Sequence, residues 1–222
     1  MRRFLCHVLA LTALLTGGTA GRASAGLVLD QVNDPGDPAG GLALYAGNDL
    51  VQTFTAGQTG NLDEIDVRIF NHSGATASVI LELWTFTGTT LTTQIGGDFT
   101  VPSSSVPTTT GFVSFDLSGS APHIVAGDHL AILLKTTTSS AQFYGWQFTQ
   151  NASFPGGEAF STADGSTLDS IFQDGTLVDF GFKTFVDPNA APIPEPSSLV
   201  LASMGIMTGA WPFRRLRRRE PD

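Results

Sequence analysis

Cysteine is almost missing from this chain. Its single cysteine, Cys6, lies within the first apolar segment of the sequence. Residues 26–190 therefore contain no thiol, which excludes disulfide bonds and a nucleophilic cysteine from that region. A domain of this kind must be stable through its packed core alone.

Positive charge is also scarce in the middle of the chain. Residues 26–190 contain 17 Asp and Glu residues but only Arg68, Lys135 and Lys183 as basic residues, a formal net charge of −14. Nucleic-acid binding depends on cations that contact phosphates, so we expect no nucleic-acid partner. An acidic surface favours solubility and attracts divalent cations.

The common catalytic motifs are missing as well. The sequence has no Gly-x-Ser-x-Gly elbow, no His-Glu-x-x-His motif and no phosphate-binding loop. His123 and His129 flank the turn at Gly127 and are candidates for a metal pair, although exposed turn histidines are commoner. Glu82 and Asp66 form a candidate carboxylate pair if their strands are neighbours. We expect no enzyme, and an extracellular hydrolase is the disfavoured alternative.

The two ends of the chain carry the clearest signals. Arg2 and Arg3 precede the apolar segment 4–15, and Ala23 and Ala25 form a small-x-small cleavage site. This pattern predicts a signal peptide over residues 1–25, with the Sec export machinery and signal peptidase as partners. The mature chain then begins near Gly26.

The C-terminal end has three parts in a fixed order. Pro194, Glu195 and Pro196 come first, and their prolines favour an extended backbone. The 17 residues 197–213 are nearly uncharged. As a helix they would measure about 26 Å, the short end of a transmembrane span. The arginines that follow predict a cytoplasmic stop, and they are Arg214, Arg215, Arg217, Arg218 and Arg219.

These three parts, together with the N-terminal signal, resemble the PEP-CTERM sorting signal of bacteria, which here spans residues 191–219. The resemblance implies that an exosortase, a membrane-embedded cysteine protease-transpeptidase, recognises the tail. It also implies contact with the inner membrane through the helix, transient because the tail is removed. The protein would then be released or transferred to the cell envelope, the outer surface or the extracellular matrix.

Residues 26–190 have the composition and periodicity of an all-β domain. Apolar residues alternate with polar ones in segments such as 79–84, 113–117 and 180–185, and Gly- and Pro-containing turns separate them. This pattern predicts an antiparallel β-sandwich. The order of segments resembles the jelly-roll ectodomains of bacterial surface proteins, which are similar to carbohydrate-binding modules.

Calcium is the first ligand hypothesis. Asp30, Asp34 and Asp37 lie within a short Pro- and Gly-containing segment, and calcium prefers oxygen ligands from irregular loops. Two further acidic groups are Asp63, Glu64 and Asp66, and Asp164, Asp169 and Asp174. The alternative is that such residues simply form turns.

A glycan is the second ligand hypothesis. Tyr144, Trp146 and Phe148 share one face of a predicted strand, and Trp84 shares a face with Glu82. Exposed aromatic faces stack on sugar rings, so these four residues form a candidate platform for exopolysaccharide. The alternative is that the rings fill the core. Two functions follow: a non-enzymatic surface or matrix protein, or a carbohydrate-binding module on the same anchor.

Overall fold

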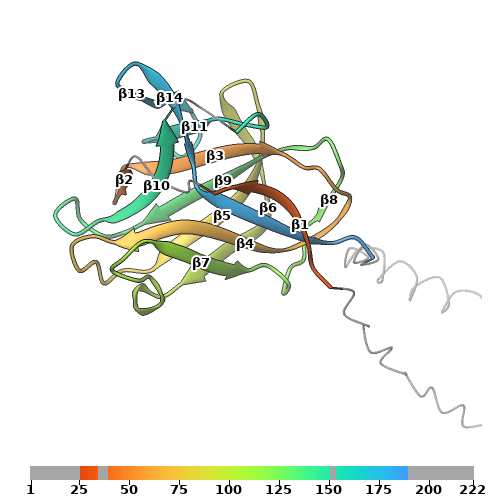
Figure 1. Cartoon of the computed structure of the whole chain (residues 1–222), viewed down its shortest axis with the longest axis horizontal. Coiled ribbons are helices and arrows are strands. Elements are labelled where there is room, and N and C mark those ends of the chain that lie inside the picture. The colour runs from red at the N-terminus through yellow and green to blue at the C-terminus, as the bar shows by residue number, and fades with distance from the viewer. Residues whose placement is uncertain (1–25, 35–39, 151–153, 190–222) are drawn as a thin grey trace, which may run out of the picture.

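The computed structural model describes residues 26–34, 40–150 and 154–189, and this part of the chain is all-β (Figure 1). The only helical element in it is one turn of 3-10 helix, η1, at Ser103–Ser105. The strands are β1 Val28–Asn33, β2 Gly40–Leu44, β3 Asp49–Thr55, β4 Gly60–Asn71, β5 Val79–Thr87, β6 Thr90–Val101, β7 Gly111–Asp116, β8 His123–Ile124, β9 His129–Thr136, β10 Tyr144–Gln150, β11 Ala159–Thr162, β12 Asp169–Ser170, β13 Phe172–Gln173, β14 Thr176–Phe180 and β15 Phe182–Asp187.

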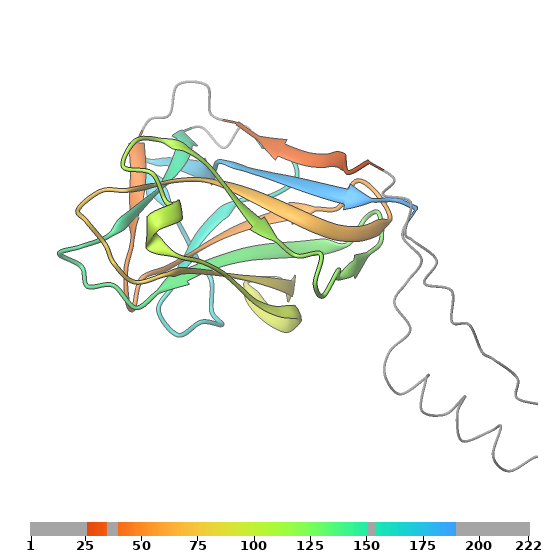
Figure 2. The ribbon, with the colours of Figure 1, turned by 90° about the horizontal axis from the view of Figure 1, so that it is seen from below.

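The strands form two sheets, and every strand pair is antiparallel. The first sheet runs β1-β15-β4-β10-β14-β13, with β2 added to β10 and with β7 and β8 added to β4. The second sheet runs β12-β11-β3-β9-β5-β6. Figure 2 shows the two sheets as stacked layers. The all-β prediction and the antiparallel sheets are therefore confirmed.

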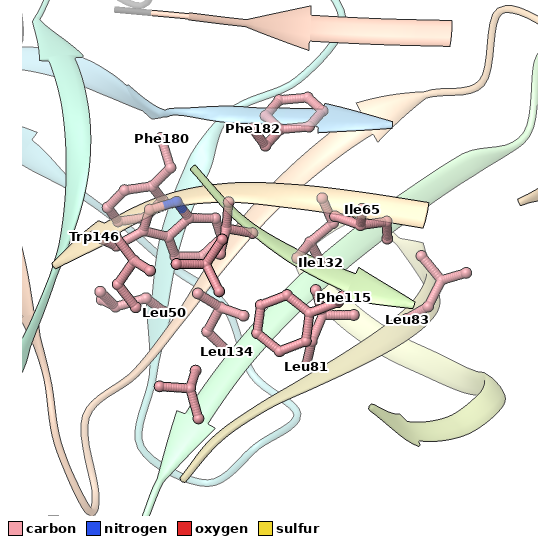
Figure 3. Close-up of a cluster of buried hydrophobic side chains, with 14 of the residues drawn as sticks. Leu50, Ile65, Leu81, Leu83, Phe115, Ile132, Leu134, Trp146, Phe180 and Phe182 are labelled. Carbon is pink, nitrogen blue, oxygen red and sulfur yellow. The ribbon is translucent and has the colours of Figure 1, made fainter. Parts of the chain in front are cut away.

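The main core lies between the two sheets, because alternate residues of facing strands point inward. Ile65 of β4 and Phe115 of β7 meet Leu81 of β5 and Ile132 of β9 (Figure 3). In the same core, Trp146 of β10 stacks on Phe180. All of these side chains are at most 1% exposed. The alternation that the sequence predicts over residues 79–84 and 113–117 thus reflects one buried face on β5 and one on β7.

A buried polar side chain also connects the two sheets. Gln52 of β3 accepts a hydrogen bond from the Phe180 amide of β14 at 2.7 Å, and its own amide contacts Asp179 at 3.4 Å. Asp179 in turn accepts a hydrogen bond from the Phe154 amide at 2.9 Å. Buried polar groups of this kind fix one relative placement of the sheets, since a shift would leave them unpaired.

The outer face of the second sheet carries a smaller apolar cluster. Val51 and Leu133 belong to it, and Leu91 and Leu168 cover them from the hairpin and from the loop before β12. The Leu91 amide donates to Ser166 O at 3.0 Å, and the Leu168 amide donates to Thr89 O at 2.9 Å. These bonds fold the β5–β6 hairpin end back over its own sheet.

The first and last strands of the described region are direct neighbours. Val28 of β1 pairs with Val186 of β15, so the start of β1 and the end of β15 lie at the same end of the molecule (Figure 1). The predicted signal peptide and the predicted sorting segment lie outside the described residues. Among the residues that are described, no helix is long and apolar enough to cross a membrane.

Candidate functional site

The structure contradicts most of the predicted glycan platform. Tyr144, Trp146 and Phe148 point into the core and are 0%, 0% and 5% exposed. Tyr144 donates its hydroxyl proton to Ala77 O, and the Trp146 indole donates to Gly181 O at 2.9 Å. The platform prediction is wrong for these three residues, because β10 lies inside a covered sheet and its large rings fill the interior.

Trp84 lies on the other sheet, away from those three rings. It is half-buried on the outer face of β5, and its indole donates to Glu82 Oε2 at 2.8 Å. Glu82 also accepts from Lys135, whose ammonium lies 3.8 Å from Asp98. The four aromatic residues therefore do not form one surface, and Trp84 packs against the smaller apolar cluster.

The proposed calcium ligands have other partners. Asp34 forms ion pairs with Arg68 and with Lys183, the latter at 3.9 Å. Asp30 accepts a hydrogen bond from the Gly57 amide at 2.9 Å and another from the Thr184 hydroxyl at 3.3 Å. Burial raises the pKa of the Asp30 carboxyl despite these bonds. Asp37 lies outside the described residues.

No group of three or more His, Cys, Asp or Glu side chains could hold a metal ion within residues 26–34, 40–150 and 154–189. Asp30 and Asp34 are not joined there by a third ligand. His123 contacts Asn61 at 3.3 Å, whereas His129 contacts Thr55 at 3.2 Å. The two histidines thus have separate neighbours, on β4 and β3.

The other acidic groups are similarly occupied. Glu64 and Asp66 share the outer face of β4, where burial is the main cause that raises the pKa of both carboxyls. Asp66 belongs to the first sheet and Glu82 to the second, so they do not form the carboxylate pair considered above. Asp164 closes a turn by accepting from the Thr167 and Ser166 amides at 2.8 Å each, which lowers its pKa.

The outer face of the first sheet carries a group of aromatic rings that the sequence did not indicate. Phe70 and Phe143 are half-buried, and His72 is exposed. The His72 and Phe143 rings are stacked, with centroids 4.5 Å apart and planes 13° from parallel. Phe70 lies 6.0 Å from His72, at a tilt of 55°. We call Phe70, His72 and Phe143 the outer aromatic surface.

Two glycines form the floor under Phe70. A Cβ atom at Gly145 would lie 2.4 Å from the Phe70 ring, and one at Gly41 would lie 2.7 Å from it. Real Cβ atoms do not approach so closely, so the ring rests directly on the backbones of β10 and β2. The register between β4 and β10 pairs Gly145 with Phe70. The two residues are far apart in the sequence, so no local pattern indicates this contact.

The backbone around the other two rings is held by hydrogen bonds. The His72 amide donates to Phe143 O at 3.2 Å, and the Phe143 amide donates to Ser73 Oγ at 2.9 Å. Asn71 makes two bonds with Ala75, both of 2.8 Å, that close the turn after β4. The end of β4 and the start of β10 therefore hold the stacked rings in one arrangement.

Gln147 lies on the same face of β10 as Gly145. Its amide reaches across β4 and donates to Thr110 Oγ1 at 2.6 Å. The side chain is only 5% exposed, yet its Oε1 accepts no hydrogen bond from the described residues. The bond from Gln147 fixes the hydroxyl of Thr110, which is exposed at the surface.

A shallow open hollow lies elsewhere, between β2, β3 and β11. Its lining includes Leu42, Leu50 and Ile171 as apolar residues and Asn48 and Ser161 as polar ones. It contains no titratable side chain. The outer aromatic surface, in contrast, holds three rings in a defined arrangement and includes the titratable His72.

Two comparisons with known proteins found no match. No protein-family model matches the chain, and no curated protein matches its sequence.

Proposed function

We propose that this protein is a non-enzymatic cell-surface or extracellular-matrix protein, exported by the Sec route and sorted by an exosortase through residues 191–219. The observation that carries the proposal is the order of parts at the C-terminus: Pro194-Glu195-Pro196, a 17-residue apolar run, and five arginines. Each part occurs in many proteins, but this order at one end and a signal peptide at the other are typical of exported substrates of a sorting enzyme.

The position of the last strand supports this proposal. β15 ends at Asp187, and only the six residues 188–193 precede Pro194. Six extended residues span at most about 20 Å. If residues 197–213 lie in the membrane, the folded domain stays beside the bilayer until the tail is cut. The motif then lies between the two, where a membrane enzyme has access to it.

The described domain suits display better than catalysis. Its two antiparallel sheets enclose one continuous core, and its histidines and acidic groups bond to separate structural partners. We further propose that the sandwich has the jelly-roll-like topology of bacterial surface ectodomains. An acidic domain without thiols tolerates an oxidising exterior, because it has neither a cysteine to oxidise nor a disulfide to reduce.

Mass spectrometry of the exported protein tests the sorting proposal. In cells that contain an exosortase, we expect the protein to lose its tail near Pro194 and its N-terminal residues 1–25. In cells without the enzyme, the tail should remain. Pro194→Ala should also retain the tail, whereas Pro192→Ala, outside the triplet, should be processed normally. An uncut tail in both strains would contradict the proposal.

A further inference from the structure

We propose that the outer aromatic surface, together with the Thr110 hydroxyl, binds a neutral polysaccharide. This inference concerns the folded domain alone and does not depend on export or sorting. It differs from the sequence-based platform in every residue, because the rings involved lie on the opposite face of β10.

The shape of the site favours a sugar ring. Phe70 lies on Gly41 and Gly145, so one ring face is held by backbone while the side chain keeps a partly exposed surface. The stacked His72 and Phe143 rings continue this apolar strip. A pyranose ring has an apolar C–H face that stacks on such rings, and binding sites commonly combine aromatic side chains with a few polar groups.

The Thr110 hydroxyl suits a contact with a sugar hydroxyl. Thr110 is exposed, and its hydroxyl can donate as well as accept. The buried Gln147 amide donates to this hydroxyl at 2.6 Å, which leaves the Thr110 proton to be donated to a sugar oxygen. Gln147 therefore positions the Thr110 hydroxyl and does not itself contact the sugar.

The charge around the site favours a neutral polymer. The domain has a formal net charge of −14, which repels polyanions such as uronate-rich polysaccharides. The nearest cations, Arg68 and Lys183, are paired with Asp34 and lie over the Phe112 ring. They are therefore already engaged and do not offer an open anion site.

Affinity electrophoresis of the full-length chain in detergent tests this proposal. Native gels would contain one soluble probe each: a β-glucan, a galactomannan, a xylan, or alginate as the anionic control. We expect at least one neutral probe to retard the protein and alginate to leave its mobility unchanged. If no neutral probe retards the protein, or if alginate retards it most, the proposal is wrong. If the surface binds a protein and not a polysaccharide, no neutral probe should retard the protein.

Glycine variants test whether binding depends on the position of the Phe70 ring and not only on its presence. Gly145→Ala keeps Phe70 but forces its ring off the β10 backbone, so we expect an at least tenfold weaker affinity, as for Phe70→Ala. Gly40→Ala is the matched control, because its Cβ would meet Phe148 at an ordinary 3.5 Å. Phe172→Ala removes an exposed ring elsewhere and should bind normally. Equal retardation of Gly145→Ala and the unchanged protein would overturn the proposed site.

Gln147→Met tests the polar contribution. The substitution keeps the length of the side chain but removes the amide that fixes the Thr110 hydroxyl, so affinity should fall severalfold while the melting temperature stays near that of the unchanged protein. Unaltered affinity would show that the bond from Gln147 to Thr110 positions no ligand contact and would contradict the assigned roles of both residues. Melting curves of all variants ensure that lost binding is not lost folding.

Discussion

The two faces of strand β10 differ in how they use aromatic rings. On the inner face, Trp146 is fully buried and stacks on Phe180 with ring centroids 4.3 Å apart. On the outer face, β10 contributes Gly145, and the ring above it comes from Phe70 of the neighbouring strand. Large side chains of one strand thus stabilise the core, whereas its small residues leave room for a surface built by its neighbours.

The largest expected effect tests the inner face. Trp146→Ala removes a fully buried indole and its hydrogen bond to Gly181, so we expect a loss of about 3–5 kcal/mol in the free energy of unfolding. Urea unfolding followed by circular dichroism measures this loss. A cost below about 1 kcal/mol would show that the inner face is not the stabilising one.

A smaller effect tests the polar link between the sheets. Gln52→Ala leaves the Phe180 amide without its acceptor, and we expect a loss of about 1–3 kcal/mol. Gln58→Ala is a suitable control, because Gln58 is half-buried and makes one long bond of 3.4 Å to Leu29 O. The control should change stability by less than about 0.5 kcal/mol. Equal effects would mean that Gln52 does not hold the sheets together.

The pH dependence of the melting temperature allows the buried carboxyl of Asp179 to be compared with the exposed carboxyl of Asp164. Burial raises the pKa of Asp179, so the folded protein keeps that proton to higher pH than the unfolded chain does. Stability from this group is therefore greatest at low pH and is lost as pH rises through the folded pKa. Burial raises the pKa of Asp30, Asp49, Glu64 and Asp66 in the same direction.

We therefore expect the melting temperature to rise as pH falls from about 7 towards about 4.5. Asp179→Asn should flatten this rise. Asp164 acts in the opposite direction, because amide hydrogen bonds lower its pKa and its stabilising effect is lost only in stronger acid. Asp164→Asn should leave the rise unchanged. A melting temperature that falls steadily from pH 7 to 4.5 would contradict the assigned burial of these carboxyls.

The smallest expected effect concerns the outer face. Phe70→Ala removes a half-buried ring, so we expect a loss of about 1 kcal/mol or less in the free energy of unfolding. Phe172, at 59% exposure, should contribute even less. Urea titration of both variants beside Trp146→Ala completes the comparison. A loss for Phe70→Ala as large as that for Trp146→Ala would make its ring a core residue and not part of a binding surface.

Local patterns in the sequence predicted the strands well and the sites poorly. The alternation over residues 79–84 predicted one buried face of β5, and Val79, Leu81 and Leu83 are fully buried. The alternation in β10 separated its two faces correctly. It did not say which face is covered, so Trp146 was placed on the wrong side.

The candidate sites depended on contacts between distant residues. Asp34 is neutralised by Arg68 and Lys183, which reach it only because β1, β15 and β4 lie side by side. Without the strand order, the sequence around Asp34 fits a calcium-binding loop as well as an ion pair. The calcium hypothesis followed from that ambiguity.

The sequence by itself determined the all-β class and the acidic, thiol-free composition of the domain, because these depend on composition and on short-range periodicity. The signals at both ends remain predictions from the sequence. Only the tertiary structure decided which aromatic rings are buried and which are exposed. Phe70 and Gly145 are 75 positions apart, and their contact exists because β4 pairs with β10 in one register. A period of two residues defines the faces of a strand, but only the packing of a second sheet selects the one that meets solvent.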